Sequence, residues 1–466
     1  MIFSSLPFLI FFLIYLPLHL LIPSRHRLKL IIIGGTVFYG YWNIYYVWIP
    51  YVLLGVAFIG ASYMQGAADR DLKRIRFISV LFVLLLPLIF FKYTNFFVSL
   101  IIAPFSSNVV SIVNYPLPLG LSFITFTLIA YVADVYKGHF PIENSLQRIG
   151  AYVLFFPHSI AGPILRPHEF IPQLKRKFRA LDAKFAVGTA IFSVGLFKKV
   201  VFADQLSPVV DAVYSGPDGL TSLHYLLSIY GFSLQIYCDF SGYTDMAIGL
   251  AMILGIHFPN NFYKPYLSSS VAEFWHRWHI TLSRWIRDYL YIPLGGNRFG
   301  LYKQIRNLFI TMSIAGLWHG ANITFVLWGV IHAFGISISY LSSKINFIRK
   351  ITDWPSKWLL TLITFNFVTF AWIFFRARNI DTAFRIISGP FAAPIGDISL
   401  FLERNMFVIL LLLFFAFIHR FDDHARVRFF IKKAPKPLVW ISVGLLWVLT
   451  ISIGTGSSGQ FIYFDF

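Results

Sequence analysis

Charged residues are scarce in this chain of 466 residues, because Asp, Glu, Lys and Arg together make up only 13% of it. A soluble domain carries about 25% charged residues, so a soluble protein is excluded. Hydrophobic residues make up 57% of the sequence. Apolar stretches of roughly 20 residues, the length that crosses about 30 Å of hydrocarbon, recur from end to end. We therefore predict one multi-pass membrane domain over residues 1–466, built as an all-α bundle of transmembrane helices.

Cysteine is almost absent, because Cys238 is the only one. A single thiol excludes an intrachain disulfide and a two-thiol relay. The N-terminus also lacks a basic region and a small-residue cleavage site, so residues 1–22 are interpreted as a retained span and not as a signal peptide. No convincing internal repeat is present, which disfavours a secondary transporter with two similar halves.

Basic residues lie between the apolar runs, so the net charge of +19 indicates membrane topology and not nucleic-acid binding. The basic clusters at residues 25–29, 70–76, 175–184, 344–350 and 420–436 are expected to be cytoplasmic, with both termini outside. The expected spans lie at about residues 2–22, 30–66 (two), 77–103, 113–136, 185–203, 222–256, 306–340 (two, or broken), 357–375, 405–418 and 437–453.

The strongest candidate for chemistry is His319, in the segment Gly316-Leu-Trp-His-Gly-Ala-Asn322 of an apolar stretch. Ionisable groups inside apolar segments are costly and usually functional. The two glycines and the asparagine can interrupt a helix, which is tolerated at membrane depth where protein buries the backbone or a cavity admits water. A neutral imidazole there can remove a proton from an attacking hydroxyl. The alternative is a structural histidine hydrogen-bonded within the bundle.

Residues 270–292 predict an amphipathic helix on the cytoplasmic side. Ser270 and Glu273 have the spacing of a capping box, which marks a helix start. At 100° per residue, the charged side chains share one sector and the aromatic side chains lie opposite. His279 falls at the edge of the aromatic side and is expected to point into protein, whereas His276 lies among the charges and is expected to be solvated. A metal site built from these two residues and His319 is not predicted, because no HExxH pattern or Cys/His cluster is present.

Two carboxylates, Asp239 and Asp245, interrupt another apolar stretch. Their six-residue spacing does not stack them on one helical face, so a shared acid/base pair is not favoured. They can orient a histidine or pair with arginines of the amphipathic helix, and structural pairing is the preferred interpretation.

The C-terminal segment 454–466 is expected to be an outward-facing tail. Residues 454–459 match the Gly-x-Gly-x-x-Gly pattern of dinucleotide-binding proteins. They follow a predicted span and precede no helix, so they are interpreted as a flexible tether. The tether carries Tyr463 in an aromatic end. This end can be an interfacial anchor, or the phenol of Tyr463 can be a nucleophile that becomes acylated.

Five motifs occur in order along the chain: Phe155-Phe-Pro-His-Ser-Ile-Ala-Gly-Pro163, Tyr237-Cys-Asp-Phe-Ser-Gly-Tyr-Thr-Asp245, Phe274-Trp-His-Arg-Trp-His-Ile-Thr-Leu-Ser283, Arg287-Asp-Tyr-Leu-Tyr-Ile-Pro-Leu-Gly-Gly-Asn-Arg298 and Leu317-Trp-His-Gly-Ala321. Together they resemble the membrane-bound O-acyltransferase family. The similar branch contains the bacterial proteins of alginate O-acetylation, peptidoglycan O-acetylation and teichoic-acid D-alanylation. The resemblance implies a helical bundle with amphipathic and re-entrant helices around a central cavity.

The resemblance assigns roles to individual residues. His319 corresponds to the catalytic histidine of the family and His279 to its second histidine, while His276 stands where this branch usually has Arg or Lys. The closing Phe461-x-Tyr463-x-x-Phe466 resembles a C-terminal motif of envelope acylation systems, which favours Tyr463 as an acyl carrier. Residues of the shared motifs are expected at the substrate: Trp318, Asn322, Asp239, Tyr243, Asp245, Asn297 and Arg298.

The activity implied by the resemblance is O-acetylation of an envelope or exported polysaccharide, either alginate-like or peptidoglycan. The expected donor is acetyl coenzyme A from the cytoplasm, with no bound cofactor or metal. The expected partners are the lipid of a bacterial inner membrane and a separate extracytoplasmic acetyltransferase of the SGNH type, which passes the acyl group to the polymer; no nucleic acid is expected. D-alanyl transfer from a carrier-protein thioester is one alternative, and a membrane transporter is an alternative of another class.

Overall fold

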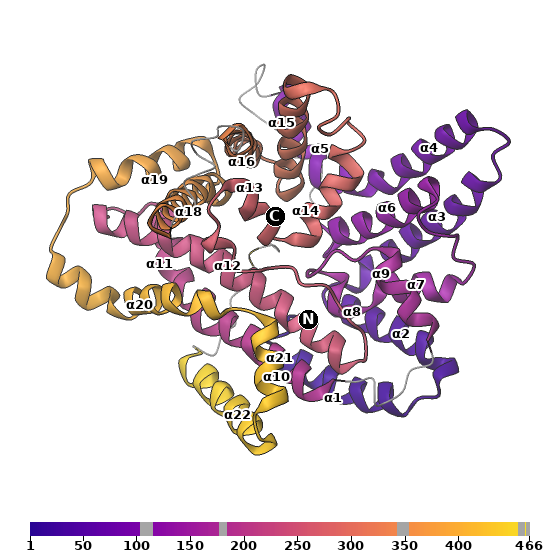
Figure 1. The fold of residues 1–466 in the computed structure, drawn as a ribbon, viewed down its shortest axis with the longest axis horizontal. Helices are drawn as coiled ribbons and strands as arrows, with labels where there is room; N and C mark the ends of the chain where they lie inside the picture. The colour runs from indigo at the N-terminus through magenta and orange to yellow at the C-terminus, as the bar shows by residue number, and fades with distance from the viewer. Residues whose placement is uncertain (103–114, 177–183, 343–353, 455–461, 463–466) are drawn as a thin grey trace. The chain divides into compact units, whose positions relative to one another are not determined.

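The structure, a computed structural model, describes residues 1–102, 115–176, 184–342, 354–454 and 462 (Figure 1). Its regular secondary structure is helical throughout these residues, which confirms the predicted all-α class. The chain forms two compact units, one of residues 1–192 with 246–259 and one of residues 193–245 with 260–466.

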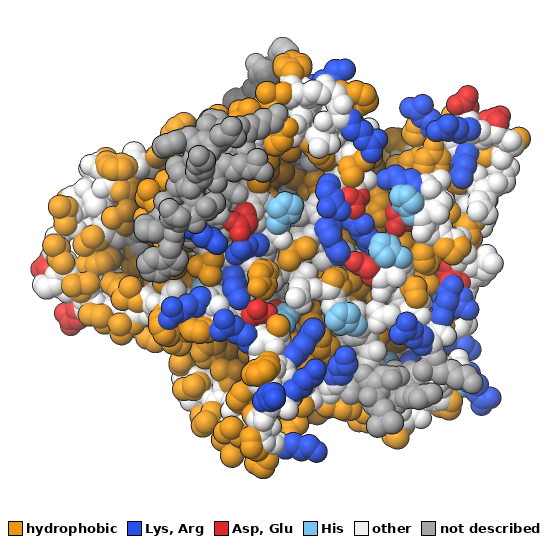
Figure 2. All heavy atoms as spheres, in the orientation of Figure 1, with side chains coloured by type: hydrophobic (Ala, Val, Ile, Leu, Met, Phe, Trp, Pro, Cys, Tyr) orange, Lys and Arg blue, Asp and Glu red, His pale blue; other side chains and the backbone are white. Residues whose placement is uncertain are grey.

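Seven helices of the described ranges are long and apolar enough to cross a membrane. They are Ile44–Gln65, Arg70–Ile101, Phe185–Ser215, Ile323–Ser342, Lys357–Arg376, Ile398–Phe421 and Lys436–Ile453. The other expected spans are also helices, but they are either shorter or more polar. An example of the more polar kind is α12 (Ser222–Ile253), which contains two aspartates. Figure 2 shows hydrophobic side chains covering the outward face around α20 (Ile398–Ile418) and α22 (Lys436–Ile453), as a lipid-facing surface requires.

The first unit consists of short and long helices around a buried aromatic core. Within it, His158 of the Phe155–Pro163 motif is buried, and its Nε2 lies 2.8 Å from the carbonyl oxygen of Tyr152. This motif is therefore part of the packing of its unit. The elements are α1 (Leu6–Leu21), η1 (Ser24–His26), α2 (Arg27–Gly40), η2 (Ile44–Tyr46), α3 (Trp48–Gln65), α4 (Arg70–Leu88), η3 (Ile89–Tyr93), α5 (Thr94–Ile102), α6 (Leu121–Lys137), α7 (Leu146–Leu154), α8 (Phe156–Ser159), α9 (Pro167–Lys175), and most of α10 (Phe185–Phe197).

The second unit contains every described residue that the sequence predicts for chemistry. In addition to α20 and α22 and most of α12, its elements are η5 (Lys198–Ala203), α11 (Asp204–Ser215), η6 (Pro265–Leu267), α13 (Val271–Arg277), α14 (Ile280–Ile286), η7 (Arg287–Tyr291), α15 (Gly300–His319), α16 (Ile323–Ser342), α18 (Trp354–Arg376), α19 (Ile380–Ala392), η8 (His419–Phe421) and α21 (His424–Lys433).

Helices α15 and α16 form a tightly packed hairpin and lie side by side in Figure 1. Glycine is required where they cross: a Cβ on Gly316 would lie 2.1 Å from the carbonyl oxygen of Phe325, and one on Gly329 would lie 2.1 Å from that of Met312. Small residues allow helix backbones to approach this closely. The hairpin places His319, the last residue of α15, against α16. The region expected to hold two spans, or a broken one, over 306–340 thus forms two helices, of which α16 is among the seven that can cross a membrane and α15 is not.

The single amphipathic helix predicted over residues 270–292 is wrong. The chain leaves α13 at Trp278 and enters α14 after His279, whose φ of 41° lies in the left-handed region, and η7 is a π-helical turn. A non-glycine residue adopts this conformation only when its surroundings hold it. Because the helix direction changes at residue 279, one helical wheel cannot describe the faces of both halves.

Candidate functional site

His319 lies buried at a junction of three helices. Its side chain is 4% exposed. The imidazole centroid is 4.7 Å from the ring of Trp318 on α15, 5.1 Å from that of Trp328 on α16 and 5.1 Å from that of Phe375 on α18. The predicted burial of His319 is confirmed. An imidazole in such an aromatic shell is shielded from water.

The aromatic shell continues from His319 to a second buried histidine, His332 on α16. The ring of Trp328 is 4.8 Å from that of His332, and the indole Nε1–H of Trp275 on α13 donates to His332 Nδ1 over 3.2 Å. His332 was not predicted from the sequence. The signal was present, because His332 is an ionisable residue inside the apolar run 323–342, but no glycine or asparagine beside it marks a broken helix.

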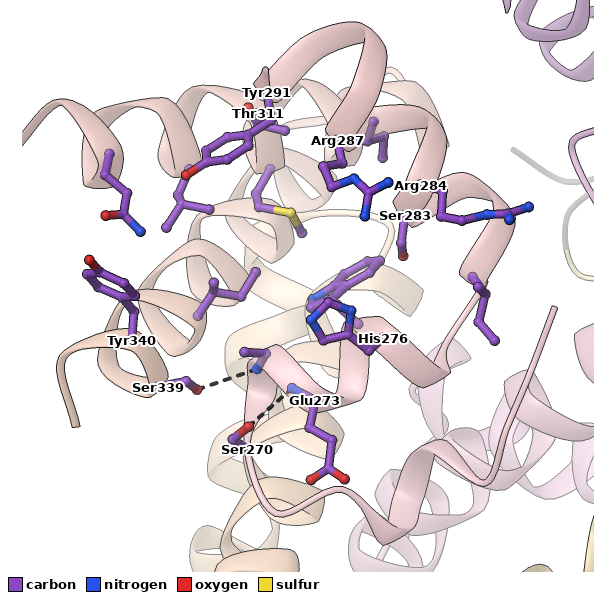
Figure 3. Close-up of a pocket in the computed structure, with 18 residues that line it drawn as sticks. Ser270, Glu273, His276, Ser283, Arg284, Arg287, Tyr291, Thr311, Ser339 and Tyr340 are labelled. Carbon is purple, nitrogen blue, oxygen red and sulfur yellow. Dashed lines mark hydrogen bonds between the residues drawn. The ribbon is translucent and has the colours of Figure 1, made fainter. Parts of the chain in front are cut away.

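A cavity of about 640 Å³ lies between α13, α14, α15 and α16 (Figure 3). Figure 3 shows His276, Arg284 and Arg287 grouped on one side of it and Tyr340 and Ser339 on the other. The lining residues are Ser270, Ala272, Glu273, Trp275, His276, Ile280, Ser283, Arg284, Ile286, Arg287, Tyr291, Gln304, Leu308, Thr311, Met312, Ile336, Ser339 and Tyr340.

The cavity approaches the aromatic shell of His319 along two elements. Met312 lines the cavity and lies seven residues before His319 on α15. Seven residues make two helical turns, so both side chains leave the same side of the helix about 10 Å apart along its axis. Trp275 lines the cavity too, and its ring is 5.7 Å from that of Trp328. Indoles therefore separate the cavity from the imidazole of His319.

Basic side chains give the cavity the character of an anion site. Arg284 and Arg287 lie in its wall, and the exposed His276 lies beside them, as its predicted solvation requires. Two acids of this region have partners: the Glu273 carboxylate accepts from Ser269 and pairs with Arg277, and Asp288 pairs with Arg287 at 2.6 Å. Although partial burial by itself raises the pKa of Glu273, these partners lower the pKa below its usual value. Guanidinium groups such as those of Arg284 and Arg287 can donate paired hydrogen bonds to phosphate oxygens.

His279 is a neutral imidazole whose proton lies on Nδ1 and not on Nε2. The Oδ1 of Asn261 accepts from the backbone N–H of Thr281 at 3.2 Å, so the Nδ1 of His279, 3.1 Å from the same oxygen, must carry the proton that it donates. Burial lowers the pKa of His279 to about 3. Its Nε2 is buried and has no hydrogen-bond partner among the described residues. The predicted inward orientation is confirmed, since His279 is 0% exposed.

Asn261 explains why the helix breaks at this point. Its Oδ1 also accepts from the Thr281 hydroxyl at 2.8 Å, and its backbone carbonyl accepts from the N–H of Ile280 at 2.9 Å. Asn261 thus satisfies backbone and side-chain donors in the first turn of α14, which a continuous helix would satisfy internally. These contacts come from a residue 18 positions before His279 and were not predictable from helical periodicity.

Asp239 and Asp245 pair with lysines, as structural pairing predicted, although the partners are not the arginines of the amphipathic segment. Lys199 lies 2.6 Å from Asp239, and Lys198 lies 2.7 Å from Asp245. Both lysines come from the π-helical turn η5. From consecutive positions of that turn, both side chains reach aspartates of α12. The aspartates therefore neutralise buried ammonium groups from another span.

Two further groups join these ion pairs. His424 Nε2 lies 2.7 Å from Asp245, and Lys198 also lies 2.7 Å from Asp422. Burial raises the pKa of Asp422, but the charges of Lys198 and His419 and the hydrogen bonds from Lys198 and Tyr237 together outweigh this and lower the pKa to about 2. The backbone N–H of Ile462 in the tail donates to Asp239 at 2.7 Å.

The other residues expected at the substrate do not line the cavity. Asn322 caps α16 and donates to the carbonyl oxygen of Arg378, and Trp318 packs on His319. Tyr243 is buried on α12, while Asn297 and Arg298 are exposed in the turn before α15. Tyr463 lies outside the described residues. Within the described ranges, no cluster of histidine, cysteine and carboxylate side chains is arranged to hold a metal ion.

Comparison with known proteins identifies relatives over most of the chain. A model of the membrane-bound O-acyltransferase family matches residues 143–380. The probable alginate O-acetylase of Azotobacter vinelandii is 40% identical over 84% of this chain and 78% of its own length. The peptidoglycan O-acetyltransferase of Helicobacter pylori is 36% identical over 77% and 72%. The teichoic acid D-alanyltransferase of Bacillus subtilis is 29% identical over 56% and 69%.

Proposed function

The chain belongs to the membrane-bound O-acyltransferase family, and we propose that it takes an acetyl group from a cytoplasmic thioester and delivers it for O-acetylation of an envelope or exported polysaccharide. The observation that carries this proposal is the position of His319. His319 is a buried imidazole two helical turns after Met312, which lines a cavity together with Arg284 and Arg287. The relatives with the higher identities are O-acetylating proteins that act on alginate or peptidoglycan, which favours a polymer of one of these kinds.

The donor proposed for the cavity is acetyl coenzyme A. Its phosphates match the guanidinium groups of Arg284 and Arg287. Its long thiol arm can cover the distance of about 10 Å along α15 between Met312 and His319. The arm must pass Trp275 and Trp328, so these indoles shift when the donor binds. The donor then places its thioester carbonyl beside His319.

His319 acts as the general base in this proposal. It takes the proton of the acceptor hydroxyl as the hydroxyl oxygen attacks the thioester carbonyl carbon. The tetrahedral intermediate collapses with cleavage of the carbon–sulfur bond, and the imidazolium returns the proton to the leaving thiolate. His279 shapes the surroundings of the site, held in place by Asn261.

The acceptor proposed for this step is the phenol of Tyr463, which then carries the acetyl ester outward. A separate extracytoplasmic acetyltransferase of the SGNH type would pass the group on to the polymer. The basic clusters between the apolar runs support a cytoplasmic entry side and a tail on the opposite side of a bacterial inner membrane.

A second candidate reaction is D-alanyl transfer from a carrier-protein thioester, since a D-alanyltransferase is among the relatives. Its donor also ends in a phosphopantetheine arm, which the same cavity and the same histidine can accept. A transporter of an anionic substrate, the alternative of another class, predicts substrate movement without acylation of the protein.

The test is peptide mapping of the purified protein in lipid nanodiscs after incubation with isotopically labelled acetyl coenzyme A. We expect label on the C-terminal peptide of the wild type and none in His319→Ala or Tyr463→Phe. The hydrolysis of acetyl coenzyme A by Tyr463→Phe should persist at a low rate, because His319 can then activate water. If the folded wild type remains unlabelled with acetyl coenzyme A but is labelled by a D-alanyl carrier protein, the donor is the carrier-protein thioester and not acetyl coenzyme A.

A further inference from the structure

His332 is an imidazole that carries its proton on Nε2. The indole Nε1 of Trp275 lies 3.2 Å from Nδ1 of His332. An indole nitrogen can only donate a hydrogen bond, so Nδ1 of His332 accepts and holds no proton. The one proton of the neutral ring therefore lies on Nε2, which makes this atom a donor. His279 has the opposite tautomer, with an Nε2 that can only accept.

The Nε2–H of His332 has no hydrogen-bond partner among the described residues, although the side chain is 0% exposed. The same holds for the indole Nε1–H of Trp328, whose ring lies 4.8 Å from that of His332 and which is also 0% exposed. Leaving a buried donor unpaired is destabilising, and such groups are rare in folded proteins. Two of them on adjacent rings indicate a missing acceptor.

Both donors belong to the shell of the catalytic base. The ring of Trp328 is 5.1 Å from His319 on one side and 4.8 Å from His332 on the other. Trp275, which fixes the tautomer of His332, lines the cavity that we assign to the donor. A carbonyl oxygen brought from the cavity to His319 thus arrives among N–H groups that lack a partner within the described ranges.

We propose that the Nε2–H of His332 and the Nε1–H of Trp328 form the oxyanion hole of the acyl transfer. This inference rests on the proposed function. When the acceptor oxygen bonds to the carbonyl carbon and its proton passes to His319, the π electrons of the carbonyl move onto its oxygen. The two N–H groups donate to that negative oxygen. When the carbonyl re-forms, the carbon–sulfur bond breaks, and the thiolate takes the proton back from His319.

A pair of amide substitutions at position 332 separates the donor role from packing. His332→Gln places an amide N–H near the position of Nε2, whereas His332→Asn places an amide near Nδ1, where its oxygen can accept from Trp275. We expect His332→Asn to keep the KM for acetyl coenzyme A but to lower kcat about 100-fold or more, the usual effect of losing one oxyanion donor. His332→Gln should keep a kcat well above that of His332→Asn.

Matched tryptophan variants extend the test. Trp328→Phe removes the proposed donor and keeps a ring, so kcat should fall. Trp372 is the control, because its indole stacks on Trp328 at 5.7 Å and its N–H is also buried without a partner among the described residues. Trp372→Phe should leave kcat unchanged, provided that thermal unfolding in nanodiscs shows all four variants to be folded.

The outcomes are distinct from failure of the proposed function, which would appear as an unlabelled wild type. An active wild type with equal kcat in His332→Asn and His332→Gln would overturn the oxyanion hole and make His332 a packing residue. A loss of kcat in Trp372→Phe equal to that in Trp328→Phe would overturn it too.

Discussion

The indole of Trp328 lies between two buried histidines, 5.1 Å from the ring of His319 and 4.8 Å from the ring of His332. His319 ends α15, and His332 lies within α16. The close crossing of these helices at Gly316 and Gly329 brings both residues to one aromatic cluster. This arrangement joins the proposed base to N–H donors that have no partner among the described residues, and acyl transfer to a hydroxyl requires both components.

Removing the base should abolish acylation without unfolding the protein. We expect His319→Gln to lower the acylation rate by about 100-fold to 10,000-fold, the range contributed by general acid–base catalysis. Binding of acetyl coenzyme A should persist, because His319 does not line the cavity. Single-turnover labelling gives the rate, and calorimetric titration of the donor gives the affinity. Loss of binding together with rate would contradict the separation of the base from the cavity.

Neutralising the cavity arginines should weaken donor binding. We expect Arg284→Gln and Arg287→Gln each to raise the KM for acetyl coenzyme A about 10-fold, because a charge-assisted hydrogen bond contributes about 1.5–3 kcal/mol. The KM for acetyl pantetheine, which has no phosphate, should stay unchanged. Arg298→Gln is the matched control, since Arg298 is exposed and does not line the cavity. An equal rise in KM for both donors would show that the arginines shape the cavity and do not bind phosphate.

His279 should make stability depend on pH in the acidic range. Its folded pKa of about 3 lies below its unfolded value of 6.5. The unfolded chain therefore binds the proton first, so stability is full above pH 6.5 and falls as pH decreases towards 3. His279→Asn should reduce this dependence, because an amide does not titrate. The variant should still fold, because the amide N–H can donate to Asn261 and asparagine tolerates a positive φ. Thermal unfolding of both proteins between pH 7 and pH 4 is the measurement; parallel curves would show that His279 does not titrate in this range.

The pair of Lys199 and Asp239 should be strongly coupled. We expect Lys199→Met to destabilise the protein by about 3–5 kcal/mol, because it removes the ammonium group that pairs with the buried carboxylates of Asp239 and Asp204. Adding Asp239→Asn should recover part of this loss. A double-mutant cycle of unfolding free energies measures the coupling, and additive effects of the two substitutions would rule it out. Lys175→Met serves as the control, since Lys175 is 47% exposed and its partner Glu143 keeps a second ion pair with Arg148.

Much of the fold could be predicted because the segments that lipid surrounds are continuous apolar runs of the sequence. Long apolar runs must become helices in lipid, so the all-α class and most spans follow from composition. The same logic selected His319, which is costly to bury and lies between glycines. The span expected over 222–256 is the helix α12 (Ser222–Ile253), and lysines from another helix neutralise its aspartates.

The sequence by itself determined the membrane class, the family and the candidate base, because each depends on residue type and order along the chain. Only the tertiary structure decided where the helix over 270–292 breaks, which lysines pair with Asp239 and Asp245, and that His332 belongs to the shell of His319. These features arise from contacts between residues far apart in the sequence, such as Asn261 with His279 and Trp275 with His332. Periodicity along one helix carries no information about the side chains that another helix brings to it.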